Sequence, residues 1–253
     1  MNIAWFDGQD ILRFPSVEHA LAEPDGLLAI GGNLSVKTLR NAYENGIFPW
    51  FDETQPIMWW SPSIRAVIQT RHIHISKNMH KLIRQTQRQG QSQGQSQGQS
   101  QGQSRYQITA DRHFSAVVAA CSAVKATRQS TWITEAMRQA YQQLYDNGIA
   151  HSIEVCNADK QLVGGLYGVF VKNCFCGESM FSDERNTSKL ALIALAKFLN
   201  RHGCPLIDCQ LPTAHLATMG AVEIPRQVFI NQLENMLPNS ALVQQNWITR
   251  WQR

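Results

Sequence analysis

Three consecutive strand-like segments constrain the fold of this chain more than any other feature. Residues 151–156, 161–171 and 173–181 are rich in apolar and β-branched side chains, and turn residues separate them at 157–159 and 172–173. Such short turns join antiparallel neighbours. A strongly apolar helix is expected to begin at 186–188 and to end at Gly203, before another strand over 206–211. The pattern predicts a mixed α/β sheet, an α/β (α+β) fold.

The residues before this run predict a smaller first unit and two more helices. Ser35 is placed to cap a helix that ends at Gly46, and the following turn contains Pro49. We expect residues 1–63 to form a small aromatic-rich domain and residues 64–253 to form the larger domain. Within the larger domain, the patterns predict a strand over 65–75 and helices over 77–88, 114–124 and 134–147.

Residues 89–104 repeat the tetrapeptide QGQS four times. The repeat has neither an apolar side chain to bury nor a charge, so we expect a flexible surface loop. Insertions of this kind add little closure entropy. Deleting the repeat should therefore leave activity within a few-fold.

Positive charge is concentrated in one part of the chain. No acidic residue lies between Glu53 and Asp111, and residues 54–110 contain seven Lys and Arg. Because the whole chain has a formal net charge of +4, the other 196 residues sum to about −3. Part of this charge falls on one face of the predicted helix over 77–88, at Lys77, Lys81, Arg84 and Arg88. This stripe suggests that a polyanion binds there.

Other features exclude broad classes of protein. The longest apolar stretch, over 190–199, is too short to span a bilayer, and the first residues lack the features of a secretory signal. Six cysteines form no CxxC pair, so we expect reduced core thiols and no metal site. A cytoplasmic protein is the expectation.

Polar residues within two predicted strands are candidates for chemistry. The two-residue period places Glu178 on one face with Cys176 and Met180, and Asp208 on one face with Gln210. A carboxylate in an apolar strand is costly unless it is paired or used. From periodicity alone, a solvent-facing polar side is an equally good interpretation.

Several weaker candidates remain open at this point. Cys209 and His215 could form a nucleophile pair, although their spacing says nothing about geometry. His72 and His74 would share a strand face and could bind a metal, but no third ligand is evident. Tryptophans 50, 59 and 60 could stack on a nucleobase or pack a domain junction.

Seven longer motifs carry a resemblance to a known family. LLAIGGNLS at 27–35, GIFPWF at 46–51 and MWWSP at 58–62 resemble the N-terminal signatures of bacterial leucyl/phenylalanyl-tRNA–protein transferases. HSIEV at 151–155, GGLYG at 164–168, GESMFS at 177–182 and LIDCQ at 206–210 resemble their C-terminal signatures, in the same order. The resemblance extends from about residue 3 to 230. The QGQS insert departs from it, and nothing specific is recognised beyond about residue 235.

The resemblance implies a GNAT-like (N-acetyltransferase-like) catalytic domain after the small N-terminal domain. It implies an enzyme that moves Leu or Phe, and Met less well, from aminoacyl-tRNA to the α-amino group of proteins beginning with Arg or Lys. The product would carry a destabilising N-terminus of the N-degron pathway. The family uses no metal or coenzyme, and we expect a monomer that does not bind membranes.

The resemblance also implies roles for individual residues. Asp208 and Gln210 would orient the amine and relay its proton, with the aspartate as either a base or an electrostatic anchor, and Glu178 would line the same site. The other implied roles are an aminoacyl pocket (Met180, Phe181, Leu192, Ile207), a 3′-adenosine site (Trp50, Trp132) and phosphate contacts to tRNA (Lys77, Lys81, Arg84, Arg88).

Three other functions compete with this one. An acetyltransferase of the same superfold would need a glycine-rich loop for the coenzyme pyrophosphate, whereas residues 183–188 contain two acids and no glycine. A non-catalytic tRNA-binding module would need only the basic face. An aminoacyl transferase of cell-wall synthesis would accept a peptidoglycan precursor, but this chain is short for the doubled domain of such enzymes.

Overall fold

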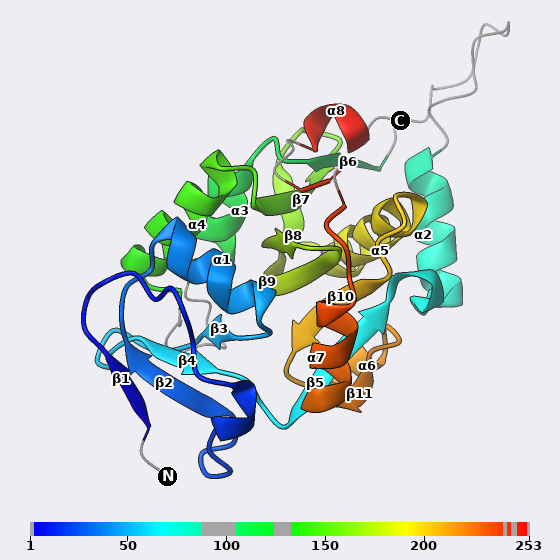
Figure 1. The fold of residues 1–253 in the computed structure, drawn as a ribbon. Helices are drawn as coiled ribbons and strands as arrows, with labels where there is room; N and C mark the ends of the chain where they lie inside the picture. The colour runs from blue at the N-terminus through cyan, green and yellow to red at the C-terminus, as the bar shows by residue number, and fades with distance from the viewer. Residues whose placement is uncertain (1–2, 88–104, 124–132, 240–241, 244–246, 252–253) are drawn as a thin grey trace, which may run out of the picture.

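The computed structural model describes residues 3–87, 105–123, 133–239, 242–243 and 247–251, and its first sheet is small (Figure 1). Four strands form it in the order β1-β2-β4-β3. Strands β1 and β2 are parallel, and the other pairs are antiparallel. The bounds are Ala4–Phe6 (β1), Leu27–Gly31 (β2), Phe48–Pro49 (β3) and Met58–Trp60 (β4).

The second sheet has seven strands in the order β11-β5-β10-β9-β8-β7-β6. Only β9 and β10 pair in parallel; their neighbours in the sheet are antiparallel. The sheet contains Ile64–Gln69 (β5), Tyr106–Ala110 (β6), Ala150–Asn157 (β7), Leu162–Val171 (β8), Cys174–Ser182 (β9), Leu206–Gln210 (β10) and Val222–Pro225 (β11). The predicted mixed α/β class is confirmed.

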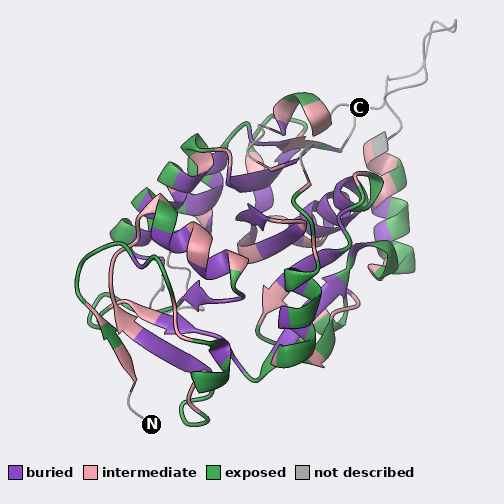
Figure 2. Cartoon of the chain, viewed as in Figure 1, coloured by how far each residue is buried: buried purple, intermediate pink, exposed green. Residues whose placement is uncertain are grey.

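Helices cover both faces of the larger sheet. Alternate residues of β8 show this: Tyr167 and Val169 pack in one apolar cluster with α3 and α4, whereas Leu166 and Phe170 pack in another with α5. Figure 2 shows the buried strands between these layers. The helices are Val36–Glu44 (α1), Lys77–Gln87 (α2), Phe114–Ser122 (α3), Glu135–Asp146 (α4), Thr187–Arg201 (α5), Ala214–Ala217 (α6), Arg226–Glu234 (α7) and Ile248–Trp251 (α8).

The helix boundaries follow the capping signals in the sequence. The Ser35 hydroxyl accepts a hydrogen bond from the backbone N–H of Thr38, and the Thr134 hydroxyl accepts one from Met137. Gly46 and Gly148 follow α1 and α4 with positive φ angles of 71° and 66°. The predicted helices at these positions are confirmed.

Three local expectations were wrong. Strand β5 ends at Gln69, and a 3₁₀ turn over Thr70–His72 follows, so His72 and His74 do not share a strand face. Glu178 is the extra residue of a bulge between β8 and β9, which moves Met180 to the opposite face from Cys176. A second bulge separates Asp208 from Gln210, whose φ is 61°.

Some expectations fall on residues outside the described part of the chain. These are the QGQS loop over 89–104, the phosphate contact of Arg88 and the adenosine contact of Trp132. Among the described residues, no helix is long and apolar enough to cross a membrane. All six cysteines lie in described segments, none of them in a disulfide bond, and five are buried.

Candidate functional site

A cluster of polar side chains lies where the two parallel strands of the larger sheet separate. Strands β9 and β10 pair only from Leu206 opposite Cys174 to Asp208 opposite Cys176. Beyond this point both strands line a cavity of about 480 Å³, to which β9 contributes Glu178 and β10 contributes Gln210. The two bulges lie at this split, so the irregular backbone turns polar side chains toward the opening.

Glu178 is held by three side-chain donors from three different elements. Its Oε1 accepts hydrogen bonds from the Tyr43 hydroxyl at 2.8 Å and from Gln210 Nε2 at 2.9 Å. Its Oε2 accepts one from the Tyr141 hydroxyl at 2.5 Å. Because Tyr43 lies on α1 and Tyr141 on α4, the carboxyl group joins β9, β10 and two helices.

The same cluster contains a third oxygen–oxygen contact, which bears on the protonation of Glu178. The hydroxyls of Tyr43 and Tyr141 lie 2.8 Å apart. Each tyrosine supplies one proton, so the three contacts among Tyr43, Tyr141 and Glu178 can each hold a hydrogen only when Glu178 supplies the third. Burial raises the pKa of Glu178 to about 7, and the hydrogen bonds from Tyr141, Tyr43 and Gln210 oppose this rise. The carboxyl can therefore give and take a proton near neutral pH.

Asp208 lies behind this cluster in a different environment. It is fully buried, and the Arg65 guanidinium binds it through two bonds, Nε to Oδ1 at 2.8 Å and Nη2 to Oδ2 at 2.7 Å. Oδ1 also accepts the backbone N–H of Gln210 at 2.9 Å. This last bond supports the left-handed backbone of Gln210, a conformation that residues other than glycine rarely adopt. Asp208 thus positions Gln210.

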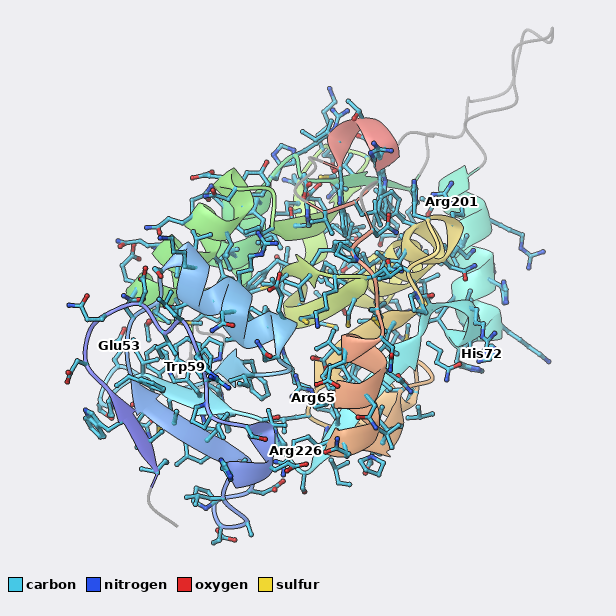
Figure 3. The ribbon with its side chains drawn as sticks, viewed as in Figure 1. Glu53, Trp59, Arg65, His72, Arg201 and Arg226 are labelled. Carbon is cyan, nitrogen blue, oxygen red and sulfur yellow. The ribbon has the colours of Figure 1, made fainter. Side chains whose placement is uncertain are left out.

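Arg65 also ties the split to the first sheet. Its third donor, Nη1, reaches the carbonyl oxygen of Gly46 at 3.0 Å, and its guanidinium lies over the rings of Phe48 and Phe229. Figure 3 labels Arg65 in the interior between α7 and β3. One buried cation therefore connects β10 to the segment that leads to Trp50.

The apolar wall of the cavity contains most of the predicted pocket. Met180, Leu192 and Ile207 line it. Phe181 does not, because it follows Met180 along β9 and therefore points to the opposite face of the sheet, where it lies with Val117 beside Gly165. Trp50 lines the rim, is 44% exposed and packs edge-on against Trp60.

The structure also brings Cys209 and His215 to this cavity. Burial raises the pKa of the Cys209 thiol well above its usual range, which opposes formation of the thiolate needed for attack. Burial and the charge of Lys189 lower the pKa of His215. Within the described part of the chain, no group of three or more His, Cys, Asp and Glu is gathered as metal ligands.

The basic stripe lies apart from this cavity, on α2. Lys77, Lys81 and Arg84 are exposed, while Met79 and Leu82 on the same helix are buried. Sequence reasoning missed three residues of the site itself: Tyr43, Tyr141 and Arg65. A tyrosine in an amphipathic helix and an arginine in a strand give no sequence signal of function, because only the fold brings them to the carboxyl groups.

Comparison with known proteins places this chain in a family. The profile described as "Leucyl/phenylalanyl-tRNA protein transferase" matches residues 67–234, and the profile of that family's N-terminal domain matches residues 32–63. A leucyl/phenylalanyl-tRNA–protein transferase of Ectopseudomonas mendocina is 45% identical over 235 residues, which cover 93% of this chain and 95% of the relative. The protein of that name from Tolumonas auensis is 46% identical over 240 residues, covering 95% and 94%.

Solved structures show more distant likenesses. FemX aligns with a TM-score of 0.42 and 10% identity over 79% of this chain and 71% of FemX. L-PGS from Bacillus licheniformis aligns with a TM-score of 0.37 and 10% identity over 76% of this chain and 56% of that structure.

The chain has a mixed α/β sheet with a polar split, and such relatives match it along nearly its whole length. Together these findings define the class: the protein is an aminoacyltransferase. The chain belongs to the leucyl/phenylalanyl-tRNA–protein transferase family.

Proposed function

We propose that this protein transfers Leu or Phe, and Met less well, from aminoacyl-tRNA to the α-amino group of proteins that begin with Arg or Lys. The product would be a substrate of N-degron degradation. The observation that carries the proposal is the cavity at the β9–β10 split, where an apolar wall faces a carboxyl group whose pKa is about 7.

The proposed reaction divides between the two sides of this cavity. The leucyl or phenylalanyl side chain packs against Met180, Leu192 and Ile207, and the terminal adenosine packs on Trp50. The α-amine attacks the ester carbonyl, the bond to the ribose oxygen breaks, and Glu178 takes the amine proton and returns it to that oxygen. Gln210 orients the amine, while Asp208 and Arg65 act as positioning residues behind it.

The tRNA would bind across the surface beyond this cavity. Exposed Lys77, Lys81 and Arg84 on α2 fit phosphate contacts that carry no sequence information. Binding should therefore weaken with salt. The proposal also divides the chain into an N-terminal domain over 1–63 and a catalytic domain over 64–253, which the two family matches support.

The test is transfer of labelled leucine from Leu-tRNA to a peptide that begins with Arg. The matched control is the same peptide with an acetylated N-terminus, which offers no free α-amine. Label on the free-amine peptide alone is the expected result. Absence of label with folded protein and intact Leu-tRNA would overturn the proposal.

A further inference from the structure

A second, smaller cavity adjoins the one at the strand split. It has a volume of about 280 Å³ and lies between α6 and the edge of the larger sheet, where Figure 1 shows α6 beside β5 and β11. Thr213 lines both cavities, so they are neighbours. Its walls are mainly small apolar side chains, including Ala66, Ala217 and Ala221, and its one ionisable lining group is Glu223.

Strand register fixes the distance between Glu223 and the proposed reaction centre. Ala66 of β5 pairs with Gln210 of β10 on one side and with Glu223 of β11 on the other. Neighbouring strands lie about 4.8 Å apart, so the backbones of Gln210 and Glu223 are roughly 10 Å apart. A long side chain that starts beside Gln210 and the side chain of Glu223 can together span this gap.

The charge of Glu223 is available to a ligand. The residue is exposed, and within the described part of the chain its carboxylate has neither a hydrogen bond nor an ion pair. The nearby buried cation, Arg65, directly precedes Ala66 and pairs with Ile224 of β11, but its guanidinium is bound to Asp208. A cation entering the smaller cavity would therefore meet an unneutralised carboxylate.

We propose that this smaller cavity binds the cationic side chain of the acceptor's first residue, with Glu223 as the residue that selects for positive charge. This inference rests on the proposed function, because it assumes that the α-amine lies beside Gln210. The alkyl stem of Arg or Lys packs on the alanine walls, and its charged head reaches Glu223, the arrangement that such amphipathic side chains favour. A neutral side chain of the same shape gains the packing but not the charge interaction.

The test compares acceptor peptides that begin with Arg or with citrulline, the neutral isostere of Arg. For Glu223→Gln we expect kcat/KM for the Arg peptide to fall about fivefold, the scale of a partly exposed ion pair, with the citrulline peptide nearly unchanged. Glu234→Gln is the matched control, because Glu234 is an exposed carboxylate on α7 that lines neither cavity. An Arg-to-citrulline ratio that is unchanged in Glu223→Gln would overturn the inference.

Binding of the same two peptides, labelled with a fluorophore and titrated without tRNA, separates this inference from the proposed function. Tighter binding of the Arg peptide to the unsubstituted protein, lost in Glu223→Gln, supports the cationic subsite even where no transfer occurs. Equal binding of both peptides by the two proteins counts against the subsite, whatever the transfer assay shows.

Discussion

Two carboxyl groups on neighbouring strands of one sheet, Asp208 and Glu178, lie in opposite electrostatic environments. Asp208 meets a fixed cation, Arg65, and has no exposed surface. Glu178 meets only neutral donors, two hydroxyls and an amide, and lines the cavity. The comparison shows how one strand split holds both a buried ion pair and a carboxyl group that titrates near neutral pH.

The difference follows from what each neighbour can do when protons move. A guanidinium remains charged at any ordinary pH and can only donate hydrogen bonds, so its contact with Asp208 keeps one arrangement. Hydroxyls can reverse their hydrogen bonds, so a ring of two tyrosines and a carboxyl accommodates either protonation state. Asp208 therefore suits a structural role, and Glu178 suits proton transfer.

Removing one member of the fixed pair should have the largest effect. Asp208→Ala leaves the Arg65 charge buried without its partner, and we expect a loss of about 3–5 kcal/mol in the free energy of unfolding. Urea unfolding at neutral pH measures it. Glu44→Ala is the control, because it breaks the more exposed Arg40–Glu44 pair, which should contribute less than about 1 kcal/mol.

The double variant Arg65→Met/Asp208→Leu sharpens this result. Replacing a buried pair with apolar side chains removes both charges together, so most of the lost stability should return. Transfer should remain impaired, because nothing then supports the backbone of Gln210. A double variant less stable than Asp208→Ala would show that burial of an unpaired charge is not the cause.

The titrating carboxyl should make stability depend on pH. Because the pKa of Glu178 is raised to about 7 from its usual 4.5, the folded protein keeps a proton that the unfolded chain releases. This contribution to stability is fully present below about pH 4.5 and is lost as pH rises through 7, by up to about 3 kcal/mol. Urea midpoints from pH 5 to 8.5 should show the fall in the unsubstituted protein, and Glu178→Gln should remove that component. An identical slope in both proteins would contradict the assignment.

Glu178→Gln should also slow transfer, by about a hundredfold, the usual scale for loss of a general base. The unsubstituted enzyme should become faster as pH rises through about 7, when the carboxylate forms to accept the amine proton, and the variant should lose this rise. Single-turnover transfer to an Arg-starting peptide measures both effects. A variant with undiminished rate would assign Glu178 a binding role instead.

The sequence predicted the strands of this site but not its shape. Alternation identified the segments carrying Glu178 and Asp208, and the capping signals at Ser35 and Thr134 located α1 and α4. Period-two reasoning failed at the bulges, because an extra residue shifts every side chain after it to the other face.

The partners of the two carboxyls were beyond sequence reasoning for a different reason. Tyr43 and Glu178 are 135 residues apart, and Arg65 and Asp208 are 143 residues apart. Contacts at such separation depend on how the strands order in the sheet, and the parallel pairing of β9 with β10 leaves no local signal. The family resemblance supplied Glu178, Asp208 and Gln210 without the contacts that distinguish their roles.

The smallest expected effect tests the hydrogen-bonded ring formed by Tyr43, Tyr141 and Glu178. Tyr43→Phe removes one donor to Glu178, which should cost about 1 kcal/mol of stability and raise the pKa of Glu178 further, since that hydrogen bond lowers it. The rise of transfer rate with pH should therefore move to higher pH. Tyr145→Phe is the matched control, because its hydroxyl donates to the backbone oxygen of Asp111 on the same face of the sheet but does not contact Glu178. Equal pH profiles in the two variants would show that the ring holds Glu178 in place without setting its proton affinity, and the contrast with Asp208 would then be one of charge alone.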